Sequence, residues 1–293
     1  MASKFKGRLL PFFLLLPTFV ILTVFLYYPQ IETFILSTYQ VAFFGLRKTF
    51  VGIGNYLSLF QSPDYLYSVM VSLIFSGGVL LLSMSGGLGL ALLLNKKIKG
   101  ARIYRMALIW PYALSPAVAG LIWLYIFSPN SGVVNYALGT LFNIQPNWIG
   151  NPTLALLLVI FTAAWKQLGY NIVFYLAALQ NVPGQVLEAA TIDGANAFQR
   201  FWRVTFTLIS PTTFFLVITD LVYVFFETFG MIDIMTAGGP VNATNIMIYR
   251  LYQDGFRYFE TGLASAESAI LFVMMVILTW IQFRIQRKWV YYA

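Results

Sequence analysis

The sequence contains no histidine and no cysteine, and charged residues make up only 10 % of its 293 positions. Without cysteine the chain can form no disulfide and offers no thiolate nucleophile. Without histidine it lacks the commonest metal ligand and general base. A soluble globular protein carries about 25 % charged residues. The composition therefore excludes an ordinary soluble domain, predicts no metal site and argues against enzymatic activity within this chain.

The sequence also lacks a G-x-x-x-x-G-K-[ST] loop, so we expect the chain itself to bind no ATP and no other cofactor. Its net charge is +8, but nucleic-acid binding would need a large basic soluble face, and the composition leaves no room for one. Apolar residues are abundant instead. The hydrophobic fraction is 59 % and the mean hydropathy is +0.77, which indicates a polytopic membrane protein.

Six apolar runs are long enough to cross a bilayer, which takes about 20 helical residues. We predict an all-α fold, with one transmembrane domain over residues 1–293. The predicted spans are Leu9–Tyr28, Val69–Leu94, Met106–Phe127, Thr153–Gln180, Phe206–Phe229 and Leu263–Phe283. No small-residue cleavage site follows the first run, so we interpret it as an uncleaved span. Gln30–Phe43 has apolar residues at helical spacing and is predicted to lie along the outer interface.

Prolines and small residues predict details of the second and third spans. Pro111 and Pro116 predict a bend in the third span, because proline removes a backbone donor and clashes with the preceding turn. The uncharged segment Asn130–Asn151 that follows is predicted to be a short outer loop. A stripe of small residues four apart in the second span permits close helix packing: Ser83, Gly87 and Ala91.

A polar interval, Asn181–Thr205, separates the fourth and fifth spans and reads Glu-Ala-Ala-Thr-Ile-Asp-Gly-Ala at 188–195. We predict a helix over Gln185–Ile192, since these residues are good helix formers. Gly194 can adopt the left-handed conformation that ends such a helix. A second helix is predicted over Phe198–Val204. The interval would then be a helical hairpin suited to docking into a soluble partner.

This hairpin resembles the EAA loop of binding-protein-dependent ABC importer permeases, at Glu188, Ala189, Ala190, Asp193, Gly194 and Ala195. The resemblance implies the type I ABC importer permease fold and a coupling helix, including Phe198, Arg200 and Phe201, that docks onto separate ATPase subunits. Two such subunits would hold ATP and Mg, and a second permease subunit and an extracytoplasmic substrate-binding protein would complete the importer. The alternative is an ordinary helix ended by glycine. The family usually has Leu-Pro where this chain has Phe206-Thr207, which leaves the start of the fifth span undefined.

Basic residues are distributed unevenly between the two sides of the predicted membrane domain. Thirteen lie on the side of the EAA loop: Lys4, Lys6, Arg8, Lys96, Lys97, Lys99, Arg102, Arg105, Arg200, Arg203, Arg284, Arg287 and Lys288. Four lie on the other side: Arg47, Lys48, Arg250 and Arg257. The positive-inside rule then places the EAA loop and both termini in the cytoplasm. We expect a multi-pass protein of the bacterial inner membrane.

Three charged residues, Lys166, Asp220 and Glu267, fall inside predicted spans. A rise of about 1.5 Å per residue puts all three at ~21–24 Å from the cytoplasmic boundary. Because an ionised group in the bilayer is costly unless hydrated or paired, they predict a shared polar chamber. The predicted substrate path comprises these charges, their neighbours at helical spacing and Asn171: Lys166, Tyr170, Asn171, Asp220, Tyr223, Glu227 and Glu267. The alternative is that Lys166 and Asp220 form a structural ion pair.

The segments Trp165-Lys166-Gln167, Tyr170-Asn171 and Gly238-Gly239-Pro240-Val241 are similar to those of the A-type permeases of sn-glycerol-3-phosphate importers. The similarity implies sn-glycerol-3-phosphate, and with it glycerophosphodiesters, as substrates. A lysine ammonium suits a phosphate group. Two alternatives stay open: a permease for a neutral sugar or oligosaccharide, with Lys166 structural, and an ion-coupled secondary transporter that uses Asp220 or Glu267.

Overall fold

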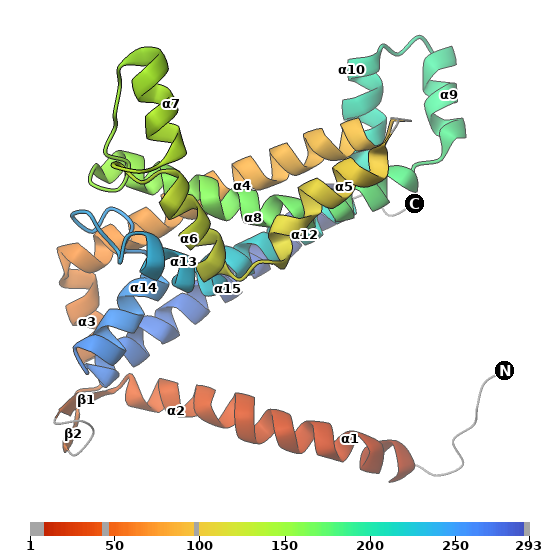
Figure 1. The fold of residues 1–293 in the computed structure, drawn as a ribbon. Coiled ribbons are helices and arrows are strands. Elements are labelled where there is room, and N and C mark those ends of the chain that lie inside the picture. The colour runs from red at the N-terminus through yellow and green to blue at the C-terminus, as the bar shows by residue number, and fades with distance from the viewer. Residues whose placement is uncertain (1–8, 43–46, 97–99, 290–293) are drawn as a thin grey trace. The chain divides into compact units, whose positions relative to one another are not determined.

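The computed structural model describes residues 9–42, 47–96 and 100–289 (Figure 1). Five of the basic residues used for the topology prediction, Lys4, Lys6, Arg8, Lys97 and Lys99, lie outside the described residues, and so does the side chain of Lys288. The predicted all-α class is confirmed, since the described chain is helical apart from one two-stranded hairpin. The chain divides into two compact units: Met1–Pro63 with Leu251–Val273, and Asp64–Arg250 with Met274–Ala293.

The first unit opens with a long helix made of α1 (Leu9–Leu22), the π-helical turn η1 (Thr23–Tyr27) and α2 (Tyr28–Leu36). Pro29 lies in the first turn of α2 and has no N–H to donate. The wider π turn just before it absorbs the missing bond, so the helix continues. The prediction of a separate interfacial helix over Gln30–Phe43 is therefore wrong, because its first part prolongs the first span.

A short β-hairpin follows this helix. Strands β1 (Tyr39–Ala42) and β2 (Arg47–Phe50) pair antiparallel, with Tyr39 opposite Phe50. Helix α3 (Gly54–Gln61) comes next, and its buried Asn55 donates to the carbonyls of Ser37 (2.8 Å) and Tyr39 (3.0 Å). These two bonds fix the turn from helix to strand. The later part of this unit contains the π turn η6 (Gln253–Arg257) and the start of α15 (Thr261–Trp289).

The second unit is built on the long helices α4 (Pro63–Leu94) and α8 (Pro152–Gln180). Its other elements are α5 (Ala101–Ile109), η3 (Trp110–Ala113), α6 (Pro116–Ile126), α7 (Val133–Phe142), α9 (Gly184–Ile192), α10 (Ala197–Arg200), η4 (Phe201–Thr205), α11 (Phe206–Leu208), α12 (Ser210–Val222), η5 (Tyr223–Glu227), α13 (Phe229–Met235) and α14 (Met247–Tyr252). The boundary between the units falls within α14, and the end of α15 also belongs to the second unit.

The predicted third span is broken rather than gently bent. Helix α5 gives way to the 3-10 turn η3, and the segments before and after the break differ in direction by 108°. Pro111 and Pro116 each lie in the first turn of a helical segment, where a missing N–H costs nothing. Ser115 caps α6 by accepting a hydrogen bond from the Val118 N–H at 3.3 Å. The two prolines thus start new helical segments instead of kinking one helix.

The predicted outer loop after this span is wrong in part, because it contains helix α7. Asn135 on α7 is buried and donates to the carbonyls of Pro129 and Pro146, both at 3.0 Å. Its side-chain oxygen Oδ1 accepts a hydrogen bond from Trp148 Nε1 at 2.7 Å. A single amide therefore ties both ends of the segment to the helix between them.

Among the described residues, five helices are long and apolar enough to cross a membrane, and the broken pair makes a sixth if it counts as one span. The five are Phe12–Leu36, Pro63–Leu94, Pro152–Gln180, Ser210–Glu227 and Thr261–Arg287. The fifth span, predicted to start at Phe206, starts at Ser210. Ile209 interrupts the helix there, with φ −89° and ψ 0°, and Pro211 occupies the first turn of α12.

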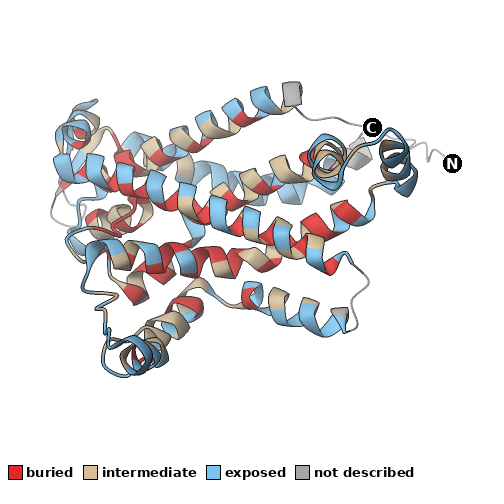
Figure 2. Ribbon diagram, turned by 90° about the horizontal axis from the view of Figure 1, so that it is seen from above, coloured by how far each residue is buried: buried red, intermediate tan, exposed pale blue. Residues whose placement is uncertain are grey.

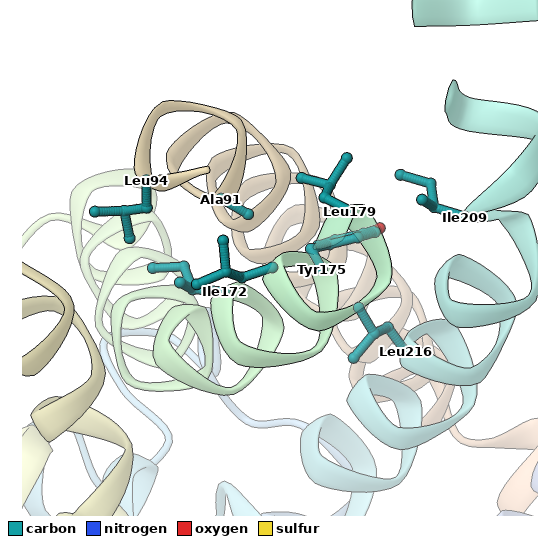
Figure 3. Close-up of a cluster of buried hydrophobic side chains, with 8 residues drawn as sticks. Ala91, Leu94, Ile172, Tyr175, Leu179, Ile209 and Leu216 are labelled. Carbon is teal, nitrogen blue, oxygen red and sulfur yellow. The ribbon is translucent and has the colours of Figure 1, made fainter. Parts of the chain in front are cut away.

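The apolar core of the second unit lies between α4, α8 and the segment around α12 (Figure 3). It comprises Ala91, Leu94, Ile172, Tyr175, Leu176, Leu179, Ile209 and Leu216. The small-residue stripe of α4 is buried, and a Cβ on Gly87 would lie 2.7 Å from the Cβ of Asn171. Close packing of α4 on α8 therefore depends on this glycine. Figure 2 shows buried positions recurring along the long helices, with exposed positions between them.

Candidate functional site

The side chain of Asp220 on α12 is fully buried, at 0 % exposure, and accepts three hydrogen bonds from neutral side chains. Gln167 Nε2 donates to Oδ1 at 2.9 Å. Asn171 Nδ2 and Ser83 Oγ donate to Oδ2 at 2.8 Å and 2.9 Å. Gln167 and Asn171 lie one turn apart on α8, and Ser83 lies on α4. Burying a carboxylate costs free energy unless its oxygens accept hydrogen bonds. Here both oxygens accept hydrogen bonds, and these bonds join three helices.

Lys166, the residue next to Gln167, points elsewhere. Its ammonium lies over the rings of Tyr112, at 5.2 Å, and Tyr223, at 5.1 Å, measured to the ring centroids. Successive helical residues are about 100° apart around the axis, so Gln167 can reach Asp220 while Lys166 cannot. Across the described parts of the chain, Lys166 makes no ion pair and no hydrogen bond with its ammonium. In the described structure Lys166 and Asp220 therefore form no ion pair, which was the alternative interpretation.

A cavity of about 240 Å³ adjoins Lys166. It is lined by Tyr112, Gln167, Tyr170, Ile218, Thr219, Val222, Tyr223 and Glu227. The rings of Tyr112 and Tyr170 contact each other at 5.2 Å. Gln167 lines the cavity and also donates to Asp220, so it connects the cavity wall to the buried polar cluster. The lining offers hydroxyl groups, an amide and one carboxylate to a small polar molecule, and the buried ammonium of Lys166 contacts two of the lining tyrosine rings.

Three residues of the predicted substrate path line this cavity: Tyr170, Tyr223 and Glu227. Lys166 contacts it through the two tyrosine rings. Asn171 and Asp220 belong instead to the polar cluster between helices, where each serves the other as a hydrogen-bond partner. Glu267 lies on α15 in the first unit and is 2 % exposed.

Tyr112 and Thr219 also line the cavity, and neither was predicted from the sequence. Tyr112 belongs to the 3-10 turn of the broken helix, so its place depends on the 108° change of direction. Thr219 directly precedes Asp220, and adjacent positions on α12 face different neighbours. A polar residue beside a membrane-embedded carboxylate was the only sequence signal for Thr219, and Tyr112 had no signal beyond its proximity to Pro111.

The EAA interval forms the predicted helical hairpin. Helix α9 ends in a left-handed Gly194, with φ +81°. The N–H of Gly194 donates to the Thr191 carbonyl at 3.1 Å, and the N–H of Ala195 donates to the Ala190 carbonyl at 3.0 Å. This pair of bonds is a Schellman motif, which satisfies carbonyls at the helix end and favours glycine at the left-handed position.

The second arm of the hairpin starts with a capping box. Asn196 Oδ1 accepts from the Gln199 N–H at 2.9 Å, and Gln199 Oε1 accepts from the Asn196 N–H at 3.0 Å. Helix α10 thus begins at Ala197, one residue before the prediction. The guanidinium of Arg200 donates to the Thr191 hydroxyl on α9 and connects the two arms.

The surface of this hairpin combines exposed charges with exposed apolar side chains. Figure 1 shows α9 and α10 projecting beyond the end of α8. Ile192 is 86 % exposed and Phe198 is 72 % exposed, and Glu188 and Asp193 are also exposed. The hairpin therefore exposes large apolar side chains next to its charges, a combination that can serve contacts with another protein.

Comparison with known protein families agrees with this architecture. The family described as "Binding-protein-dependent transport system inner membrane component" matches residues 83–291. The chain belongs to this family. The permease is accordingly a multi-pass membrane protein and a transport component of ABC importer type rather than an enzyme.

The permease is 42 % identical over 292 residues to the sn-glycerol-3-phosphate transport system permease protein UgpA of Brucella abortus biovar 1 (strain 9-941), covering 99 % of this chain and 98 % of the relative. It is 41 % identical to the protein of the same name from Agrobacterium fabrum (strain C58 / ATCC 33970), with the same coverage. The protein of that name from Yersinia pestis bv. Antiqua (strain Antiqua) is 41 % identical over 285 residues, covering 97 % and 96 % of the two chains.

Solved structures with the same fold include two of bacterial ABC transporters. One is the crystal structure of a bacterial alginate ABC transporter in complex with alginate pentasaccharide-bound periplasmic protein, with a TM-score of 0.83, 23 % identity and coverage of 95 % of this chain and 94 % of that one. The other is an ABC transporter involved in alginate import, with a TM-score of 0.82 at 23 % identity and 95 % coverage of both chains. The permease fold that the EAA resemblance implied is confirmed.

Proposed function

We propose that the permease forms half of the translocation pore of an ATP-driven importer for sn-glycerol-3-phosphate, with glycerophosphodiesters as further substrates. The observation that carries the proposal is the position of the Lys166 side chain. It is the one charged residue of the sequence between Arg105 and Glu188, and it lies over two tyrosine rings beside a cavity. The tyrosine faces stabilise the ammonium without neutralising it.

An ammonium whose donors are not used within the described structure is suited to a phosphate oxygen, which is a strong acceptor. The hydroxyl groups of Tyr170 and Thr219 and the amide of Gln167 line the same cavity and can bond the remaining phosphate oxygens or the glycerol hydroxyls. High identity along nearly the whole chain to permeases named for sn-glycerol-3-phosphate supports this substrate. In this scheme Asn171 and Asp220 support the cavity wall, and Glu267 stays a predicted residue of the substrate path.

The EAA hairpin is proposed to couple this pore to ATP hydrolysis. Its contact residues would be Glu188, Ala189, Ala190, Asp193, Gly194, Ala195, Phe198, Arg200 and Phe201. Two separate ATPase subunits would hold ATP and Mg, a second permease subunit would complete the pore, and an extracytoplasmic binding protein would deliver the substrate. The excess of basic residues near the hairpin supports a cytoplasmic location for it and for both termini.

The test is an uptake assay with the complex reconstituted in proteoliposomes, with binding protein and ATP supplied. Labelled sn-glycerol-3-phosphate and labelled maltose are compared at equal concentration. The proposal predicts uptake of the phosphate ester and none of maltose. Uptake of maltose without uptake of the phosphate ester would replace the proposal with a neutral-sugar permease, in which Lys166 is structural.

A further inference from the structure

The cavity beside Lys166 has a charged group in its wall. Glu227, at the end of η5, lines it together with Tyr223 and Tyr170. Glu227 lies one helical turn after Tyr223, whose ring contacts the Lys166 ammonium. The cavity wall therefore carries one negative charge, and the Lys166 ammonium lies against two of the tyrosine rings in that wall.

The two charges do not neutralise each other by direct contact. Within the described residues neither Lys166 nor Glu227 takes part in an ion pair, and the side chain of Glu227 is exposed. The Glu227 carboxylate thus lines the cavity without a cation in direct contact, and it repels an anion from the cavity wall. Repulsion grows with the charge of the anion, because Coulomb energy is proportional to the product of the charges.

We propose that Glu227 sets the charge selectivity of this cavity, so that the permease passes a singly charged phosphodiester more readily than a doubly charged phosphomonoester. This inference rests on the proposed function, because it assumes that a phosphate group enters the cavity. A phosphomonoester carries a charge of about −1.5 to −2 at pH 7, whereas a phosphodiester carries a single negative charge. Glu227 is the one charged residue among those that line the cavity, so the additional charge of the dianion meets a carboxylate and no lining cation.

The experiment measures the ratio of uptake rates for two labelled substrates, sn-glycerol-3-phosphate and glycerophosphoglycerol, in the reconstituted importer at pH 7. The same saturating binding protein is used throughout, so that its own preference cancels between variants. In Glu227→Gln the ratio of monoester to diester uptake should rise by about threefold to tenfold, because the variant removes a repulsion that acts more strongly on the dianion.

Two controls accompany this variant. Glu227→Asp keeps the charge and should keep the wild-type ratio, which separates a charge effect from a disturbed fold. Glu260→Gln removes an exposed carboxylate outside the cavity lining and should also leave the ratio unchanged. A ratio in Glu227→Gln within twofold of the wild-type value, or a lower one, would overturn the inference while leaving the proposed function intact. Absence of uptake of either phosphate by the wild-type importer would overturn both.

Discussion

Asn171 on α8 donates a hydrogen bond of 2.8 Å to the carboxylate of Asp220 on α12, at a point where the carboxylate is fully buried. A Cβ added at Gly87 of α4 would lie 2.7 Å from the Cβ of Asn171, so three helices meet at this residue. In a bilayer this contact is more than local packing, because an unsatisfied carboxylate there would be costly. The cluster keeps the orientation of α8 fixed, and with it the direction of Lys166.

Asp220→Ala should destabilise the permease, since Ser83, Gln167 and Asn171 would lose their common acceptor. An interhelical hydrogen bond in a membrane contributes about 0.6 kcal/mol on average. Loss of three such bonds, with three donors left without an acceptor, should lower the free energy of unfolding by about 2 kcal/mol. The melting temperature of the detergent-solubilised protein should fall by about 4–8 °C. Ser76→Ala is the matched control, because the buried Ser76 hydroxyl bonds only locally, to the Leu73 carbonyl. Equal melting temperatures for the two variants would contradict this role for Asp220.

Gly87→Ala should loosen the packing of α4 on α8, because the new methyl group would lie 2.7 Å from the Cβ of Asn171. Gly89→Ala, two residues along the same helix, meets no atom within 4 Å. Alanine is favoured over glycine inside a helix by about 0.5–1 kcal/mol, so the Gly89 variant should be neutral or slightly stabilised. Thermal unfolding of the two purified variants checks this contrast. A Gly87 variant as stable as the Gly89 variant would show that α4 can move away from α8 without a loss of stability.

Lys166→Met should lower the uptake of sn-glycerol-3-phosphate while keeping the protein folded. A charge-assisted hydrogen bond contributes about 1.5–3 kcal/mol, so the uptake rate at saturating binding protein should fall about 10- to 100-fold. Lys166→Arg should retain part of the rate because it keeps the charge. Lys48→Met removes an exposed lysine from β2 and should have no effect. Unchanged uptake in Lys166→Met would reduce Lys166 to a packing residue.

Gly194→Pro should prevent the EAA hairpin from coupling to the ATPase subunits. Proline cannot adopt the φ of +81° found there, and it removes the N–H that donates to the Thr191 carbonyl. The variant should insert normally and fail to co-purify with the ATPase subunits. Gly184→Ala, at the start of α9 with no atom within 4 Å of a new Cβ, should co-purify as the wild type does. Co-purification of a normal complex from Gly194→Pro would show that the hairpin does not couple the permease to the ATPase subunits.

Much of the helical framework could be predicted because apolar length is a local property of the sequence. The predicted fourth span starts within one residue of α8 and ends with it at Gln180. The same reasoning failed at prolines, because a helix can accommodate the missing proline N–H in more than one way. Pro29 is absorbed by a π turn that prolongs a helix, whereas Pro111 and Pro116 start separate helical segments. The residue type alone does not distinguish these outcomes.

The sequence predicts how deep in the membrane Lys166 and Asp220 lie, but not in which direction their side chains point. The helix rise places Lys166 and Asp220 at similar depth, and this predicted that they share a polar chamber. Packing of α8 against α4 decides the rotation, and it presents Gln167 rather than Lys166 to Asp220. Tyr112 enters the cavity only through the 108° break between helical segments. Such angular relationships come from tertiary contacts, which hydropathy and residue spacing along a single chain do not contain.

The most direct test of the account is the energy source of uptake. The permease is reconstituted in proteoliposomes with its partner permease, the ATPase subunits and the binding protein, and labelled sn-glycerol-3-phosphate uptake is followed with and without internal ATP. The account predicts uptake that requires ATP and the ATPase subunits and is unaffected when ionophores collapse all ion gradients. Uptake by the permease subunits alone, driven by an ion gradient in the absence of ATP, would contradict it and identify an ion-coupled secondary transporter.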